Sequence, residues 1–159
     1  DVNGDGITEL PRAVLMAGYK DTSSSDAVYM LDWYAYGIGK VPAKVATTYQ
    51  NISDAWSLLI DQKWHDRITA IKANDGGLSY VEFFEYRKNK MSIPLFNIYC
   101  ATGSNREYYA ERTDLIQLGQ TTQAIYFAKL TNEGEQSELA LTGDEIKARF
   151  SLVNQAWNN

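Results

Sequence analysis

The chain has 159 residues, of which 45% are hydrophobic, and carries a formal net charge of −5 with a sequence pI near 4.9. This acidic balance argues against nucleic acid as a partner, because binding to phosphates needs a basic surface. No apolar run approaches the roughly 18 residues of a membrane-spanning helix, so we expect no transmembrane segment. A single cysteine, Cys100, excludes an internal disulfide framework and any cysteine-based zinc cluster.

The first nine residues carry the clearest motif in the sequence. Short oxygen-bearing side chains alternate, Gly6 follows, and a further acid closes the loop, which is the spacing that Ca²⁺ favours. Gly6 permits the positive φ that such a tight curl requires. The predicted metal ligands are the side chains of Asp1, Asn3, Asp5 and Glu9 and the backbone carbonyl of Ile7.

An EF-hand is a poor interpretation of this loop. Arg12 occupies the position of the closing bidentate glutamate, and Pro11 would interrupt the exiting helix. The stretch D-V-N-G-D-G-I-T-E-L-P instead resembles the calcium loops of FG-GAP/VCBS-type propeller repeats, in which a strand follows the loop. Dockerin repeats share the opening residues but continue into a helix and recur as a pair. An ordinary polar turn without metal is the alternative.

Residues 1–50 are expected to form the end of such a propeller-like repeat. After the loop we predict a strand at residues 13–17, a polar connection at 20–26, and a hairpin whose strands are residues 29–36 and 45–49. A start at Asp1 without methionine suggests a processed or excised segment, so we expect a preceding propeller-like domain in a longer parent chain.

Residues 51–159 are expected to form a separate domain. We predict strands at residues 56–60, 68–72, 78–87, 95–101, 115–118 and 123–130. Asn74-Asp75-Gly76-Gly77 and Arg87-Lys88-Asn89-Lys90 are predicted hairpin turns. The strand at 78–87 is apolar on both faces, which predicts a central strand covered on both sides.

Two helices are predicted in this domain from capping boxes. Ser104 and Glu107 open a short helix to about residue 112, and Thr142 and Glu145 open a helix to about Trp157. The second helix carries a stripe at helical spacing, which should dock on the sheet. The predicted fold is therefore α+β: an antiparallel sheet flanked by helices, preceded by an N-terminal β-hairpin segment.

Residues 52–157 resemble the Mog1/PsbP-like domains of secreted proteins and lipoproteins of Gram-positive gut bacteria. The resemblance rests on the segments W-S-L-L-I-D-Q-K-W, I-T-A-I, V-E-F-F-E-Y, L-F-N-I-Y and A-I-Y-F-A and on the final helix. It implies an α/β/α sandwich that serves binding or structural support, in an extracellular or lipoprotein-anchored, cell-surface parent chain. It implies no catalytic residues.

The sequence offers little material for catalysis. We expect the lone His65 to be a solvated loop residue and Cys100 to be a buried structural thiol. Glu82 and Glu85 should point to opposite faces of their strand. A hydrolase with a carboxylate pair remains an alternative, since the spacing of acids in space is not visible in a sequence.

Binding is better supported than catalysis. The possible ligand contacts are Trp64, Tyr108 and Tyr109, and we expect Trp64 and one of the two tyrosines to expose their rings. The sequence thus predicts a non-catalytic surface module, with Ca²⁺ as its cofactor and a surface polysaccharide or protein as its partner. Such a module would bind a partner or act as a spacer, without an aromatic groove. The alternative is a carbohydrate- or peptide-binding domain that uses exposed aromatic residues.

Overall fold

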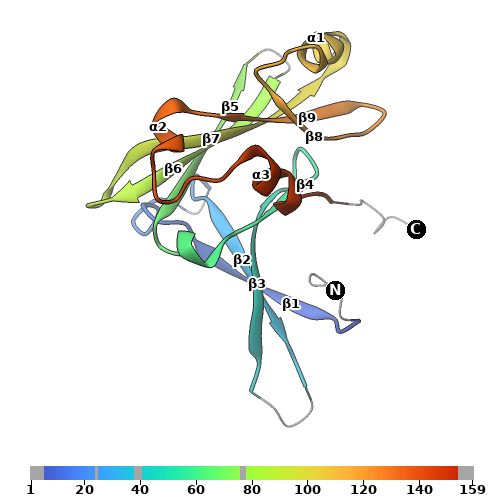
Figure 1. The fold of residues 1–159 in the computed structure, drawn as a ribbon. Helices are drawn as coiled ribbons and strands as arrows, with labels where there is room; N and C mark the ends of the chain where they lie inside the picture. The colour runs from blue at the N-terminus through green and yellow to red at the C-terminus, as the bar shows by residue number, and fades with distance from the viewer. Residues whose placement is uncertain (1–5, 24, 38–40, 76–77, 154–159) are drawn as a thin grey trace.

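Two antiparallel β-sheets, each of five strands, make up the fold. The structure is a computed structural model, and it describes residues 6–23, 25–37, 41–75 and 78–153. The sheets pack face to face. Figure 1 shows that β1, β2 and β3 extend away from the second sheet at the end where β1 and β3 begin and β2 ends. The molecule is therefore a β-rich sandwich.

The first sheet has the strand order β1-β2-β3-β4-β10, so the last strand of the chain lies beside the fourth. Its strands are β1 (Glu9–Leu15), β2 (Tyr29–Ala35), β3 (Ala43–Asn51), β4 (Trp56–Leu59) and β10 (Phe150–Leu152).

The second sheet has the order β5-β6-β7-β9-β8, so β6 and β7 lie inside it and are paired on both sides. Its strands are β5 (Ile68–Asp75), β6 (Leu78–Arg87), β7 (Lys90–Thr102), β8 (Ile116–Gln120) and β9 (Ala124–Leu130).

The helical elements are short. They are the 3₁₀ turns η1 (Gln62–Trp64) and η2 (Gly103–Asn105) and the helices α1 (Arg106–Ala110), α2 (Asn132–Glu135) and α3 (Gly143–Arg149).

The predicted α/β/α sandwich is wrong. The two sheets cover each other's inner faces, and one hydrophobic core lies between them. A face that is already buried by a sheet needs no helix, so the helices stay at one end of a sheet or in the connections. The strand β6 is central as predicted, but its outer face is only half-buried, at Tyr80, Glu82 and Phe84.

The predicted terminal helix is much shorter than expected. It ends at Arg149, and Phe150 has extended backbone angles of φ −82° and ψ 138°. The strand β10 follows, in which Phe150 pairs with Leu58 and stacks on Trp56. The spacing of Ile146 and Phe150 fits a helix, but tertiary pairing of Phe150 with β4 overrides that preference. Trp157, the end of the predicted stripe, lies outside the described residues.

Residues on both sides of position 51 share one sheet and one core. The strands β3 and β4 pair from Thr48↔Leu59 to Asn51↔Trp56, and the Tyr49 ring lies 5.4 Å from the rings of both Trp56 and Phe83. The division into segments 1–50 and 51–159 stays a prediction about ancestry, while the packing joins the two segments into one body.

The turn between β6 and β7 confirms the predicted hairpin. Arg87 pairs with Lys90, so only Lys88 and Asn89 connect the strands, and both have positive φ, at 49° and 59°. Two consecutive positive φ values define the type I′ turn that suits the right-handed twist of a hairpin. On the other side of β6, Asp75 pairs with Leu78. The two glycines of that predicted turn, Gly76 and Gly77, lie outside the described residues.

Candidate functional site

The predicted calcium loop lies at the start of β1. Asp1, Asn3 and Asp5 lie outside the described residues. Gly6 has a φ of 83°, as the tight curl requires, and Glu9 is the first residue of β1, with only 4% of its surface exposed. A strand, rather than a helix, thus begins at Glu9, and the propeller-type interpretation of the motif stays a prediction. Within the described ranges, no group of three or more His, Cys, Asp or Glu side chains is placed to hold a metal ion.

Trp64 is not an exposed aromatic residue. Its side chain is fully buried, its ring stacks on Phe96 with centroids 5.6 Å apart, and its Nε1 donates a hydrogen bond of 2.8 Å to the carbonyl of Leu139. The expectation that Trp64 contacts a ligand is wrong because η1 turns the side chain inward, where the indole N–H finds a backbone acceptor.

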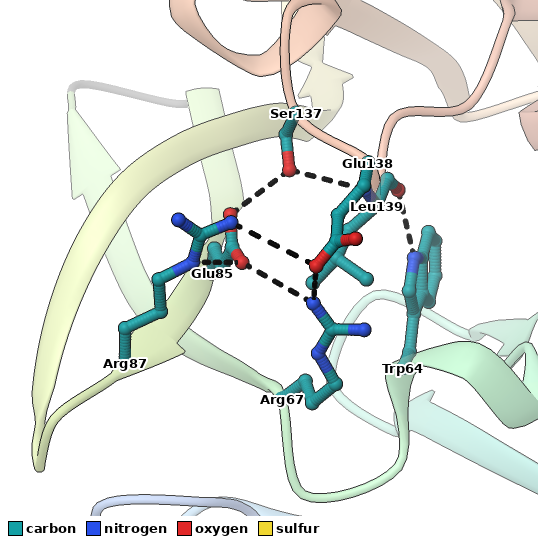
Figure 2. Close-up of polar contacts among 7 residues, drawn as sticks. All are labelled: Trp64, Arg67, Glu85, Arg87, Ser137, Glu138 and Leu139. Atoms are coloured by element: carbon teal, nitrogen blue, oxygen red, sulfur yellow. Dashed lines mark hydrogen bonds and ion pairs between the residues drawn. The ribbon is translucent and has the colours of Figure 1, made fainter.

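Beside Trp64 the structure places a cluster of paired charges, which Figure 2 shows. Glu85 is fully buried and receives hydrogen bonds from Arg87 and, at 2.9 Å, from Ser137. Arg67 lies 3.7 Å from the Glu85 carboxylate and pairs directly with Glu138. Arg87 also approaches Glu138, at 3.9 Å.

This cluster brings together two carboxylates, those of Glu85 and Glu138, and so bears on the hydrolase alternative. Glu85 and Glu138 are both engaged by Arg67 and Arg87, so the group sums to zero charge. Each carboxylate is engaged with arginines and is not poised over an open site. The arrangement ties the segment after α2 to β6, and we interpret the cluster as a structural clamp.

His65 is exposed, as predicted, and lines a hollow of about 600 Å³. Its Nδ1 lies 3.0 Å from the exposed carboxylate of Asp66. The charged groups around the hollow are paired already: Arg149 with Asp61 at 2.6 Å, and Lys44 with Asp32 at 3.1 Å. A nucleophilic site would need a hydroxyl or thiol bonded to the histidine, and the contacts of His65 do not include one.

Cys100 faces the core, as predicted. Burial, followed by the charge of Asp54, raises the pKa of the thiol to about 11. Burial likewise raises the pKa of the neighbouring Tyr126 to about 12. Since the thiolate is the nucleophile, a buried thiol whose pKa is raised in this way is poorly suited to nucleophilic chemistry.

The outer face of the second sheet carries a different set of side chains. Tyr80 on β6 lies directly opposite Tyr99 on β7, and their rings are 5.4 Å apart with an interplanar angle of 35°. The next pair in register is Glu82 and Asn97. The side chain of Tyr109, from α1, packs beside Tyr99. We call the surface formed by Tyr80, Glu82, Asn97, Tyr99 and Tyr109 the tyrosine face.

All five residues of the tyrosine face are partly exposed. Tyr99 and Tyr109 line a hollow of about 190 Å³. Tyr80 also lines a hollow of about 340 Å³, but that hollow lies towards the first sheet, beside Asn51 and Asp54. On the tyrosine face itself, the hollow therefore lies beside Tyr99 and Tyr109.

Sequence reasoning identified one end of this surface. One of Tyr108 and Tyr109 was predicted to be exposed: Tyr108 is 65% exposed, and Tyr109 is half-buried against the sheet. Tyr80 and Tyr99 were missed as ligand contacts because their strands were predicted to be covered on both faces. The alternation Tyr80, Glu82, Phe84 marks an outward face, but only the strand register shows that Tyr99 and Asn97 lie beside it.

A scan against protein-family models and searches of curated proteins and of solved structures found no match for this chain. The resemblances to FG-GAP/VCBS repeats and to Mog1/PsbP-like domains therefore stay predictions. Among the described residues, no helix is long and apolar enough to cross a membrane.

Proposed function

We propose that this chain is a non-catalytic module of a secreted or cell-surface protein, and that it binds its ligand on the tyrosine face. The observation that carries the proposal is the Tyr80–Tyr99 pair, which is partly exposed on two central strands. Tyrosine is intermediate in burial, but a group of tyrosine rings on one surface with polar neighbours is typical of binding sites.

The rigidity of the surface supports a binding role. The strands β6 and β7 are paired along their length, and they hold the two rings in place without help from a mobile loop. A ligand that meets a preformed surface loses little free energy to ordering the protein.

The tyrosine face can be tested directly as the binding site. Screening the chain against soluble polysaccharides and against a displayed peptide library should yield a ligand with a micromolar to millimolar Kd. Tyr99→Leu should weaken binding, whereas Tyr29→Leu, at a partly exposed tyrosine of the first sheet, should not. Binding that resists Tyr99→Leu and Tyr80→Leu would refute the tyrosine face as the site. Release of reducing ends or peptide fragments from the bound ligand would refute the non-catalytic role.

Calcium belongs to the proposal as a structural ion rather than as part of this binding site. The ligands would be the oxygens of Asp1, Asn3, Asp5, Ile7 and Glu9. The φ of Gly6 and the position of the buried Glu9 at the start of β1 support this set, because a bound cation would stabilise a carboxylate that has left water. The ion would fix the entry into β1.

Calorimetry with Ca²⁺ on a chain extended N-terminally past Asp1 tests this role. We expect heat of binding and a rise in Tm, both of which Asp5→Ala should abolish, because the variant removes a carboxylate ligand. The absence of both effects in the extended parent chain would rule the calcium role out.

A further inference from the structure

The chemistry of the tyrosine face points to one class of ligand. Resting on the function proposed above, we infer that this surface binds a neutral oligosaccharide: Tyr80 and Tyr99 lie under the sugar rings, while Glu82 and Asn97 bind hydroxyl groups.

The two tyrosines suit the faces of sugar rings. The face of an aromatic ring carries negative charge, and it attracts the slightly positive C–H groups that cover one side of a sugar. Tyr80 and Tyr99 lie side by side across β6 and β7 with centroids 5.4 Å apart, and only 35° separates their planes. At this spacing the rings overlap at a tilt rather than lying edge to edge in one plane, and their partly exposed parts together form the platform that would meet the ligand.

The polar residues beside this platform match hydroxyl groups. Asn97 donates from Nδ2 to the Tyr99 hydroxyl at 2.9 Å, and its bond to Glu82 is long, at 3.4 Å. The Glu82 carboxylate thus keeps capacity to accept shorter bonds from a ligand, and the Asn97 carbonyl oxygen can accept as well, since the two N–H groups of Asn97 already donate to Tyr99 and Glu82. The planar carboxylate of Glu82 and the planar amide of Asn97, next to the tyrosine rings, can bind adjacent hydroxyl groups of one sugar.

The charges around the surface favour a neutral ligand over an anionic one. Arg112 donates two hydrogen bonds, of 2.8 and 2.6 Å, to Asp114, and Lys129 lies 3.5 Å from the same carboxylate. Hydrogen bonding from Arg112 lowers the pKa of Asp114 to about 2, so Asp114 is ionised at neutral pH. With Glu82, these four side chains sum to zero charge, which leaves no surplus of positive charge for a sulfate or uronate.

The backbone argues against an extended peptide. Peptides bind to sheets most simply by adding a strand to an open edge. The platform lies on β6 and β7, whose backbone groups pair with β5 and β9 on either side. A ligand on this face must therefore be recognised by rings and side chains alone. The hollow beside Tyr99, about 190 Å³, is smaller than the roughly 300–1,000 Å³ of a drug-sized pocket and suits one end of a longer ligand.

The experiment compares wild type with Tyr80→Leu, Tyr99→Leu and the control Tyr29→Leu, by affinity electrophoresis and calorimetry. Leucine keeps apolar bulk on the strand but removes the ring. The neutral probes are mixed-linkage β-glucan, xyloglucan, arabinoxylan and galactomannan, the anionic probes are polygalacturonate and heparin, and a random peptide library is the third arm. A second variant, Tyr99→Trp, keeps an aromatic platform, and thermal melting checks that each variant is folded.

We expect at least one neutral probe to bind, Tyr80→Leu and Tyr99→Leu to weaken it about tenfold or more, and Tyr29→Leu and Tyr99→Trp to retain it. Anionic or peptide ligands that are lost in the same leucine variants would overturn the neutral sugar and leave the tyrosine face as a binding site. Neutral binding that both leucine variants retain would overturn the site itself. Failure of all neutral probes to bind at millimolar concentration would overturn this inference.

Discussion

At the scale of single residues, the clearest constraint is a carboxylate in the core. Glu85 shares the inner face of β6 with Val81 and Phe83, and all three are fully buried. A charge in this position is tolerated only because Arg87, Arg67 and Ser137 surround it. Arg87 ends β6 itself, Arg67 lies just before β5, and Ser137 lies in the segment after α2, so the carboxylate joins distant parts of the chain, as Figure 2 shows.

Glu85→Gln should therefore destabilise the protein by about 3 kcal/mol, because it leaves the arginines without their buried partner. Glu138→Gln, at a 63% exposed side chain of the same cluster, should cost no more than about 1 kcal/mol. Urea denaturation of both variants measures the difference. Equal losses would show that burial of Glu85 does not set the strength of the cluster.

The buried thiol and phenol predict how stability depends on pH. In the unfolded chain Cys100 ionises near its ordinary pKa of 9.0, whereas in the folded protein it keeps its proton up to about 11. The unfolding free energy should be at its full value below pH 9 and should fall as the pH rises towards 11, because only the unfolded state releases the proton there. Tyr126, with its pKa raised to about 12, extends this loss to higher pH.

Urea denaturation at pH 7, 9, 10 and 11 measures this loss, and Cys100→Ala should make the decline shallower. In the native state at pH 7 a thiol reagent should label Cys100 only slowly. A stability that stays constant to pH 11 would contradict the assignment of a buried neutral thiol.

At the scale of elements, the two predicted capping boxes had different outcomes. Thr142 is the N-cap of α3 and accepts from the Glu145 N–H at 3.2 Å, while Glu145 accepts from the Thr142 N–H at 2.8 Å. Ser104 is not a cap, because η2 begins at Gly103 and includes it. Both boxes have the same local pattern, so the sequence does not distinguish them without the turn geometry before each helix.

Thr142→Ala should cost about 1 kcal/mol of unfolding free energy, since it removes the acceptor for the N–H of Glu145. Ser104→Ala should be near neutral and is the matched control. Chemical denaturation of the two variants tests the contrast, and a comparable loss at Ser104 would show that its hydroxyl does cap α1.

Strands and turns were more predictable than helices for a physical reason. The apolar run of residues 78–87 identifies β6, and Lys88-Asn89 identifies its turn, since both signals are local. The end of α3 is not local: Phe150 leaves the helix because β4 offers it a partner at Leu58. The tyrosine face could not be predicted for the same reason, because only the register of β6 and β7 brings Tyr80 and Tyr99 together.

At the scale of the whole molecule, one core unites strands that the sequence assigns to different domains. Met30 and Tyr49, from residues 1–50, belong to the same buried cluster as Trp56, Phe83 and Ile146. Helices are not needed to close such a core, because the two sheets bury each other. This shared burial also explains why the resemblance to a helix-flanked sandwich does not predict the architecture.

A fragment of residues 51–159 should therefore fail to fold by itself. It would leave β4 without β3, and it would expose Trp56 and Phe83, which pack against Tyr49 in the intact chain. We expect poor dispersion of amide resonances in the fragment, and a single unfolding transition in the intact chain that coincides by fluorescence and circular dichroism. A folded fragment, or a separate transition for the environment of Trp33 in β2, would instead show that the two segments are independent units.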